Sequence, residues 1–164
     1  MIFSSARSET QRMQNEGDMR TGEVAVPWAA ATDAGLVFIG RIETPWKSRM
    51  ACPRQGDERG PLCRITLFEP WTAALDGVER FERLEAIYWL HLARRDLVRQ
   101  CARQDPVPRG TFALRSPVRP NPIGTSIVRL EGIEGATLLV RGLDCVDGTP
   151  LIDIKPDRAN FRQA

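Results

Sequence analysis

The sequence predicts a mainly β protein whose strands form either a sandwich or a barrel. Its apolar runs are short, and glycine or proline interrupts them at intervals of about 8 to 12 residues, which is typical of these two architectures. Alternating strand and helix units, which would indicate a parallel α/β sheet, are absent. The chain has 164 residues, 42% of them hydrophobic and 27% charged, as expected for one ordinary globular domain.

Two β-rich runs follow a polar beginning. Residues 1–34 show no sustained hydrophobic period and predict a flexible tail, so that residues 35–164 form the folded domain. The first run, GLVFIGRIET (35–44), is a predicted strand that ends before proline. The second, LCRITLFEP (62–70), alternates apolar and polar residues and also stops at a proline.

The middle of the chain carries the only helical spacing. Leu75, Val78 and Phe81 would share one face of a helix over residues 71–84, although Gly77 weakens such a helix by up to about 1 kcal/mol relative to alanine. The nearly continuous apolar run that follows, LEAIYWLHL, predicts a strand buried on both faces. The charged stretch after it, residues 93–110, is predicted to begin as a helix and end as a loop.

RSPVRPNPIGTS (residues 115–126) is a proline segment that neither a helix nor a central strand accommodates. Proline restricts its own φ and biases the preceding residue toward extended geometry. The segment is therefore predicted to be a stiff extended arm that loses little entropy on gripping a ligand. An ordinary surface loop is the alternative that its composition also allows.

The remaining sequence predicts strands joined by tight turns. Glu134-Gly135 and Asp147-Gly148 are turn signals, the second of them an ordinary hairpin signal. The predicted strands are TFALRS (111–116), TSIVRLEGI (125–133), ATLLVRGLD (136–144) and PLIDIKPD (150–157).

Composition and motifs exclude several functional classes. The net charge of +2 is too small to indicate a nucleic-acid binder by itself. The four cysteines contain no C-x-x-C pair and the chain has a single histidine, so no metal site is predicted. No apolar run approaches the roughly 20 residues needed to span a membrane. The amino terminus lacks a signal peptide's apolar region, which predicts a cytoplasmic protein with reduced thiols. Both glycine-rich phosphate-binding motifs and the G-x-S-x-G elbow are missing from the sequence.

Three polar clusters remain as candidates for chemistry. They are ACPRQ (51–55), the proline segment with Arg115 and Arg119, and residues 143–156, in which Asp144, Asp147 and Asp153 recur. Guanidinium groups pair bidentately with carboxylates, and aspartates accept hydrogen bonds from ribose hydroxyls or ammonium groups. Together the clusters predict a pocket for a small zwitterionic cofactor at one end of the sheet.

The same strings resemble a known family. IGRIETPWKSRMACPRQ, TFALRSPVRPNPIGTSIVRL and VRGLDCVDGTPLIDIKP are similar to the TsaA-like family, also called YaeB or TrmO, and the likeness runs from about Gly35 to Pro156. The resemblance implies a single closed, mostly antiparallel β-barrel with a few short helices, not a Rossmann fold, that forms a homodimer and binds S-adenosylmethionine. It further implies N6-methylation of N6-threonylcarbamoyladenosine beside the tRNA anticodon.

The resemblance also implies a set of site residues. His91 or Asp147 would accept the proton released during methyl transfer, although a lone histidine in an apolar strand is more often a packed residue than a base. Leu92 and Asp157 depart from the family's pattern, which keeps two alternatives open: a methyltransferase of the same fold that acts on a small metabolite, and a non-catalytic S-adenosylmethionine-binding module. The residues implied around the cofactor are Pro53, Arg54, Gln55, His91, Arg115, Thr125, Asp147, Gly148, Thr149 and Pro150.

The basic stretch is the candidate contact for RNA. Arginines on one surface neutralise phosphates, so tRNA is the predicted partner, whereas a solvated basic face is the competing interpretation. The candidate phosphate contacts are Arg94, Arg95, Arg99, Arg103 and Arg109, with Arg119 of the proline segment.

Overall fold

The computed structural model describes residues 19–26, 35–102 and 105–161 of the chain. Of the predicted tail, only residues 19–26 are described, and the rest lies outside the described residues. The described residues fall into two compact units, each considered by itself. The barrel unit contains residues 35–91 and 123–161, and the hairpin unit contains residues 19–26 and 92–122 apart from 103–104.

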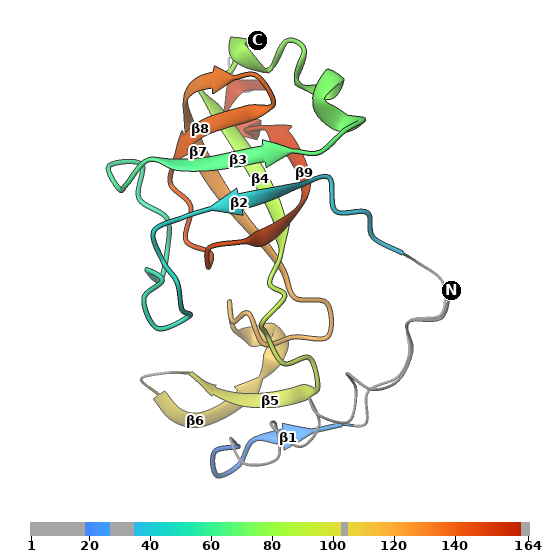
Figure 1. Ribbon diagram of the computed structural model, residues 1–164. Helices are drawn as coiled ribbons and strands as arrows, with labels where there is room; N and C mark the ends of the chain where they lie inside the picture. The colour runs from blue at the N-terminus through green and yellow to red at the C-terminus, as the bar shows by residue number, and fades with distance from the viewer. Residues whose placement is uncertain (1–18, 27–34, 103–104, 162–164) are drawn as a thin grey trace. The chain divides into compact units, whose positions relative to one another are not determined.

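Six antiparallel strands close into a barrel in the barrel unit (Figure 1). They follow the order β2-β3-β8-β7-β4-β9, and β9 pairs with β2 to complete the ring. The closed antiparallel barrel confirms the predicted fold class and decides between sandwich and barrel. The strands are β2 Gly40–Glu43, β3 Cys63–Leu67, β4 Arg83–Trp89, β7 Ile123–Glu134, β8 Thr137–Arg141 and β9 Thr149–Pro156.

Alternation along the strands fills the barrel interior. In β4, Leu84, Ala86 and Tyr88 are buried, whereas the residues between them are only half-buried. The predicted burial of this strand on both faces is therefore wrong for the outer face, because the wall of an antiparallel barrel packs a core on one side only. The other buried apolar residues of the core include Ile42, Cys63, Ile65, Val128, Leu138, Val140, Leu143, Cys145 and Leu151.

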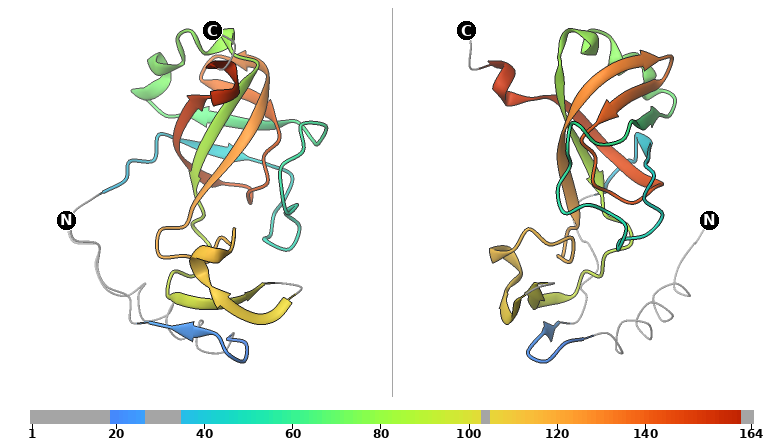
Figure 2. Two further views of the ribbon diagram at one scale, coloured as in Figure 1. Left: turned by 180° about the vertical axis from the view of Figure 1, so that it is seen from behind. Right: turned by 90° about the vertical axis from the view of Figure 1, so that its left-hand side faces the viewer.

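The two ends of the barrel carry different connections (Figures 1 and 2). At one end lie the loop between β2 and β3 (residues 44–62) and the loop between β8 and β9 (residues 142–148), where β4 also ends and β7 begins. We call this the loop end. The opposite end carries residues 68–82 and the tight turn at Gly135, whose φ of 58° fits the predicted Glu134-Gly135 turn.

The predicted helix over residues 71–84 is wrong. The chain forms two short 3-10 helices instead, η1 (Trp71–Leu75) and η2 (Val78–Arg80), and β4 begins at Arg83. Gly77 adopts a φ of 84° between them, which an α-helix cannot contain. Leu75, Val78 and Phe81 still pack against the barrel core, so the apolar spacing reports burial but not an α-helix.

The predicted helix and loop of residues 93–110 are also wrong. These residues form β5 (Leu97–Ala102) and β6 (Asp105–Gly110), and β5 also pairs with β1 (Val24–Ala25) in a three-stranded antiparallel sheet. Proline lacks the backbone donor of a central strand, but β6 is an edge of this sheet and accommodates Pro106 and Pro108.

Side chains fix the proline segment within the hairpin unit. The buried side chain of Gln100 donates from Nε2 to Thr111 Oγ1 at 3.0 Å and to the Val118 carbonyl at 2.8 Å. Arg95 donates from Nε to the Pro120 carbonyl at 2.7 Å. The segment's prolines supply no N–H groups, so these donors satisfy its carbonyls instead. The predicted strand over residues 111–116 is wrong, because this stretch begins with the 3-10 helix η3 (Thr111–Ala113) and contains no strand. A further 3-10 helix is η4 (Arg158–Phe161).

Candidate functional site

Backbone hydrogen bonds join the two loops at the loop end. The amide of Gly148 donates to the Ile42 carbonyl at 2.8 Å, and the amide of Asp147 donates to the Trp46 carbonyl at 2.8 Å. In return, the Thr44 hydroxyl donates to the Cys145 carbonyl at 2.9 Å. These bonds fix the turn at Asp147-Gly148 against the end of β2, so the turn is ordered without a ligand.

Asp147 is a carboxylate held in its charged form. Oδ1 accepts a hydrogen bond from the Thr44 amide at 3.0 Å, and Oδ2 accepts one from Lys47 Nζ at 2.8 Å. The Lys47 hydrogen bond is the main reason that the pKa of Asp147 lies below its ordinary value, and the charge of Arg41 contributes further. A carboxylate with a lowered pKa is a weak proton acceptor but a strong hydrogen-bond acceptor.

Exchange of Lys47 for methionine is expected to raise the pKa of Asp147 toward that of a free aspartate, because it removes the main stabilising contact. Stability that depends on a lowered carboxylate pKa is present above the unfolded-state pKa and is lost as pH falls through the folded-state pKa. The variant should therefore lose less stability than the parent between those two pH values. Carboxyl NMR titration and acid unfolding measure both effects.

The matched control for this change is Lys155→Met, because Lys155 forms a comparable exposed ion pair with Asp153 on β9. It should leave the Asp147 titration unchanged. A Lys47→Met protein in which the Asp147 carboxyl titrates at the parent's pH would contradict the assigned role of Lys47.

Arg41 lies directly over the glycine of the turn. Gly148 has a φ of 80°, and a Cβ atom at that position would lie 2.9 Å from Nη2 of Arg41. Only glycine combines this backbone geometry with so close an approach. Arg41 and Lys47 also line an open hollow of about 450 Å³ beside β2 and β3, with Glu43, Arg64 and Asp147 among the other lining residues.

A second polar cluster lies inside the barrel at the same end. The Tyr88 hydroxyl donates to Asp144 Oδ1 at 2.6 Å and lies 2.8 Å from Ser126 Oγ, which itself donates to Asp144 Oδ1 at 2.9 Å. Burial, followed by the charge of Asp144, raises the pKa of Tyr88 well above its ordinary value, so the phenol stays protonated. Asp144 therefore accepts two hydroxyl donors and ties β4, β7 and the loop after β8 together.

Two cysteines near this cluster have raised pKa values. Burial raises the pKa of the Cys52 thiol, and the charge of Asp144 adds to the effect. Burial also raises the pKa of Cys145 to about 12. The loop that carries Pro53, Arg54 and Gln55 lies against the loop after β8 through the close backbone approach of Gly56 to Gly142. All four cysteines are free thiols.

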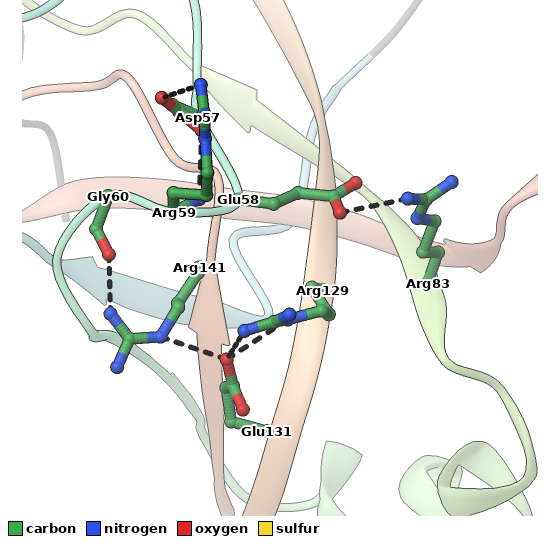
Figure 3. Close-up of polar contacts among 8 residues, drawn as sticks. All are labelled: Asp57, Glu58, Arg59, Gly60, Arg83, Arg129, Glu131 and Arg141. Carbon is green, nitrogen blue, oxygen red and sulfur yellow. Dashed lines mark hydrogen bonds and ion pairs between the residues drawn. The ribbon is translucent and has the colours of Figure 1, made fainter.

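Ion pairs clamp the far part of the 44–62 loop to the outer wall of the barrel (Figure 3). Arg83 Nη2 donates to Glu58 Oε2 at 2.9 Å, and Arg141 Nη1 donates to the Gly60 carbonyl at 2.5 Å. Arg141 also donates from Nε to Glu131 at 2.9 Å, and Glu131 in turn accepts from Arg129. A Cβ at Gly56 would lie only 1.7 Å from the Gly142 carbonyl oxygen, so the two loops cross in backbone contact.

The barrel unit brings most of the predicted cofactor residues to the loop end. Pro53, Arg54 and Gln55 are exposed in the 44–62 loop, and Thr125 is exposed near the start of β7. His91 follows β4 and is exposed, with its amide donating to the Trp89 carbonyl at 2.8 Å. The turn residues at this end are Asp147, Gly148, Thr149 and Pro150, of which Thr149 is buried.

Arg115 and the described arginines of the predicted RNA contact belong to the hairpin unit. Arg115 is an exposed side chain of the hairpin unit, and Arg103 lies outside the described residues. The remaining arginines of the predicted RNA contact, Arg94, Arg95, Arg99, Arg109 and Arg119, all belong to the hairpin unit.

His91 is the titrating group that the site offers near neutral pH. Partial desolvation lowers its pKa below the ordinary value of 6.5, and the positive charge of Arg41 lowers it further. The imidazole is therefore neutral at pH 7 and able to accept a proton.

Sequence reasoning missed part of the site. The sequence pattern does not predict Arg41, Lys47 and Ser126, because their roles depend on neighbours that are distant in the sequence. Tyr88 did carry a signal: it is the only tyrosine in the chain and lies in an apolar run, where a buried phenol needs a hydrogen-bond partner. Asp144 had been assigned to a polar cluster without a role.

The described residues contain neither a membrane-spanning helix nor a cluster of metal-ligating side chains. No helix among them is long and apolar enough to cross a membrane. Within the same part of the chain, no group of three or more histidine, cysteine, aspartate and glutamate side chains is arranged to hold a metal ion.

Comparison with known proteins places these features in a family. The family model described as the tRNA-methyltransferase O N-terminal domain matches residues 41–161. The probable S-adenosyl-L-methionine-binding protein VirR of Rhizobium radiobacter is 57% identical over 141 residues, which is 86% of this chain and 81% of that protein. The putative S-adenosylmethionine-dependent methyltransferase RcsF of Pseudomonas aeruginosa is 38% identical over 129 residues, or 72% of this chain and 54% of that protein.

Solved structures agree with the sequence matches. The crystal structure of TrmO from Pseudomonas aeruginosa superposes with a TM-score of 0.65 at 32% sequence identity. The match covers 81% of this chain and 60% of the TrmO chain, so this chain spans well under two thirds of that protein's length.

Proposed function

Because the chain belongs to the family of the tRNA-methyltransferase O N-terminal domain, we propose that it is an S-adenosylmethionine-dependent methyltransferase acting on tRNA. The resemblance seen in the sequence is thereby confirmed at the level of the family. The proposed target is N6 of N6-threonylcarbamoyladenosine beside the anticodon. The observation that carries the proposal is the ordered group of polar residues at the loop end. The loops 44–62 and 142–148 and the adjoining strand ends contribute its members.

The residues at the loop end suit a zwitterionic nucleoside cofactor. Arg54 offers an exposed guanidinium for a carboxylate, and the Asp147-Gly148 turn offers a fixed backbone against which the absence of a Cβ lets the Arg41 guanidinium pack. S-adenosylmethionine, when bound, supplies a methyl group already activated by the sulfonium charge. The protein's own task is then to orient the reactants and exclude water. The role of Arg115 in binding the cofactor rests on the family resemblance alone.

Between the two candidate bases, we favour His91. Asp147 is engaged by Lys47 and the Thr44 amide and has a lowered pKa, whereas His91 is exposed and neutral at pH 7. We assign Asp147 the role of holding the turn and accepting hydrogen bonds, and His91 the role of accepting the N6 proton.

Exchange of His91 for glutamine is expected to reduce the rate of methyl transfer by about a hundredfold or more, the usual effect of removing a general base. In the parent protein, the rate should fall as pH drops through the His91 pKa, below 6.5. His91 is the only histidine in the chain, so one set of imidazole resonances in NMR reports that pKa without overlap from another histidine. A variant that keeps the same rate and the same acid limb would remove His91 from the reaction.

The activity itself is tested by incubating the protein with labelled S-adenosylmethionine and either bulk bacterial tRNA or a metabolite extract. Label in tRNA, located by nucleoside analysis in N6-threonylcarbamoyladenosine, is the expected result. Label in the metabolite fraction would support a small-molecule methyltransferase of the same fold, and label in neither fraction would support a non-catalytic binding module.

The proposal includes a homodimer, which the family resemblance implies. Light scattering should give a mass twice the 18.4 kDa of one chain. A mass of 18.4 kDa at working concentrations would contradict the dimer.

A further inference from the structure

The hairpin unit carries an exposed aromatic ring that the proposed methyl-transfer chemistry does not use. Phe112 lies in η3 and is 86% exposed, more than any other large hydrophobic side chain among the described residues. Its ring adjoins an apolar hollow of about 150 Å³ whose other lining residues include Leu97, Val98, Thr111 and Pro120. A cavity of about this volume accepts one aromatic ring in other proteins.

Hydrogen bonds hold the base of this feature rigidly. The Thr111 hydroxyl donates to the Leu97 carbonyl at 2.7 Å and accepts from Gln100 at 3.0 Å, and both Gln100 and Thr111 are buried. The η3 turn therefore presents Phe112 outward from a fixed backbone. An exposed phenylalanine on a fixed turn forms a flat apolar face that is available to a ligand.

The charge of the unit indicates what kind of ligand fits. The described residues of the hairpin unit contain seven arginines and three carboxylates, a net charge of +4. The described residues of the barrel unit contain 12 basic and 14 acidic side chains, a net charge of −2. The positive charge of the described residues is thus concentrated in the hairpin unit, which carries Phe112, and this favours a polyanion as the ligand.

The three carboxylates of the hairpin unit are engaged elsewhere. Asp96 pairs with Arg94 at 2.9 Å, and Asp105 pairs with Arg109 at 2.9 Å. Glu23 accepts hydrogen bonds from the backbone amides of Arg20 and Cys101. None of these acids is recorded in contact with Arg99 or Arg119, within the described part of the unit.

Arg119 contacts the backbone of η3, and Arg99 lies on the neighbouring strand β5. Arg99 lies opposite Gly110 in the β5–β6 register and donates to the Pro108 carbonyl at 3.1 Å. Arg119 donates to the Leu114 carbonyl at 2.7 Å, just beyond η3. Both guanidinium groups thus donate to neutral carbonyls, and these contacts do not neutralise their positive charge.

From this arrangement we infer that Phe112 is a stacking platform for an unpaired RNA base, with Arg99 and Arg119 contacting phosphates of the same strand. Proteins bind single strands by this combination of an aromatic face and cationic groups. The inference rests on the proposed function in that it assigns the unpaired strand to the tRNA substrate. The predicted RNA contact thereby gains an aromatic residue that charge alone could not reveal.

The test is fluorescence anisotropy of the full chain with a labelled single-stranded oligoadenylate. Phe112→Ala should weaken binding about tenfold, the usual loss of one base stack, while Phe112→Trp should retain the affinity. Val107→Ala is the matched control, because Val107 is 56% exposed on the same hairpin but does not line the hollow. Its affinity should equal that of the parent.

Salt dependence tests the arginines separately. Arg99→Ala should reduce the slope of log affinity against log salt by about 0.7, the value for one phosphate contact with a single strand. A slope equal to the parent's would remove Arg99 from the contact. Equal affinities of the parent and Phe112→Ala would overturn the platform itself.

Three further outcomes separate this inference from the proposed function. Strand binding that depends on Phe112, without methyl transfer to tRNA, would retain the platform and reject the function. Methyl transfer with an unchanged KM for tRNA in Phe112→Ala would reject the platform and retain the function. If Phe112→Ala instead dissociates a dimer or weakens S-adenosylhomocysteine binding while RNA affinity stays unchanged, Phe112 serves another contact and the inference is wrong.

Discussion

Replacing Gly148 by alanine is expected to lower the affinity for S-adenosylmethionine about a hundredfold, equivalent to about 2.7 kcal/mol. The residue has a φ of 80°, which costs a side-chain-bearing residue roughly 1–2 kcal/mol, and the new Cβ would lie 2.9 Å from Arg41 Nη2. The turn would have to move or Arg41 would have to leave its position. Either change disturbs the surface that is proposed to face the cofactor, and isothermal calorimetry measures the loss.

The matched control is Gly135→Ala at the opposite end of the barrel. Gly135 also has a positive φ, of 58°, but no neighbouring atom lies within 4 Å of the position that a Cβ would occupy. Both variants should lose unfolding free energy because of the positive φ, Gly148→Ala more because of its added clash with Arg41, and only Gly148→Ala should lose cofactor affinity. Equal cofactor affinity in the two variants would show that the Asp147-Gly148 turn is outside the site.

Exchange of Asp144 for alanine is expected to be the most destabilising of the proposed changes, at about 2–4 kcal/mol of unfolding free energy. Asp144 accepts hydrogen bonds from the Tyr88 and Ser126 hydroxyls, and each buried donor left without its partner costs about 1–3 kcal/mol. The two hydroxyls can still bond each other at 2.8 Å, which limits the loss. Urea unfolding followed by tryptophan fluorescence measures it.

Asp153→Ala serves as the control for this variant. Asp153 forms an exposed ion pair with Lys155 on β9, and such pairs contribute little to stability. The unfolding free energy of Asp153→Ala should stay within about 0.5 kcal/mol of the parent's value. If Asp144→Ala unfolds at the same urea concentration as Asp153→Ala, the interior cluster does not hold the loop end together.

The strands of the barrel were predictable because they depend on local pattern. Period-two alternation and the following proline predict the position of β3. The turn glycines Gly135 and Gly148 predict the end of β7 and the start of β9. The structure nevertheless makes β7 longer than predicted, from Ile123 to Glu134, because its neighbours β4 and β8 supply partners along most of its length.

Two segments were beyond sequence reasoning because tertiary contacts override their local pattern. Residues 71–84 have the apolar spacing of a helix, yet Gly77 breaks it and the apolar side chains reach the core from 3-10 turns. The stretch 93–110 is rich in charge and proline, yet its described residues 97–102 and 105–110 pair as strands, β5 with neighbours on both sides and β6 at an edge.

The site was predictable in its loops and not in its cross-strand members. The segment 51–55 and the Asp147-Gly148 turn follow from unusual local composition, and both lie at the loop end. Arg41 and Ser126 enter the site only because strand register places them beside Gly148 and Tyr88. Neither residue type nor spacing along the chain reports such a neighbour.

The central claim is that the loop end of the barrel is the cofactor site. A crystal structure of the protein with S-adenosylmethionine tests it most directly. The cofactor should lie between residues 53–55 and the turn at residues 147–150, in contact with Arg54 and with the backbone of Gly148. A cofactor bound elsewhere, with these two loops in the positions described and nothing between them, would contradict the claim.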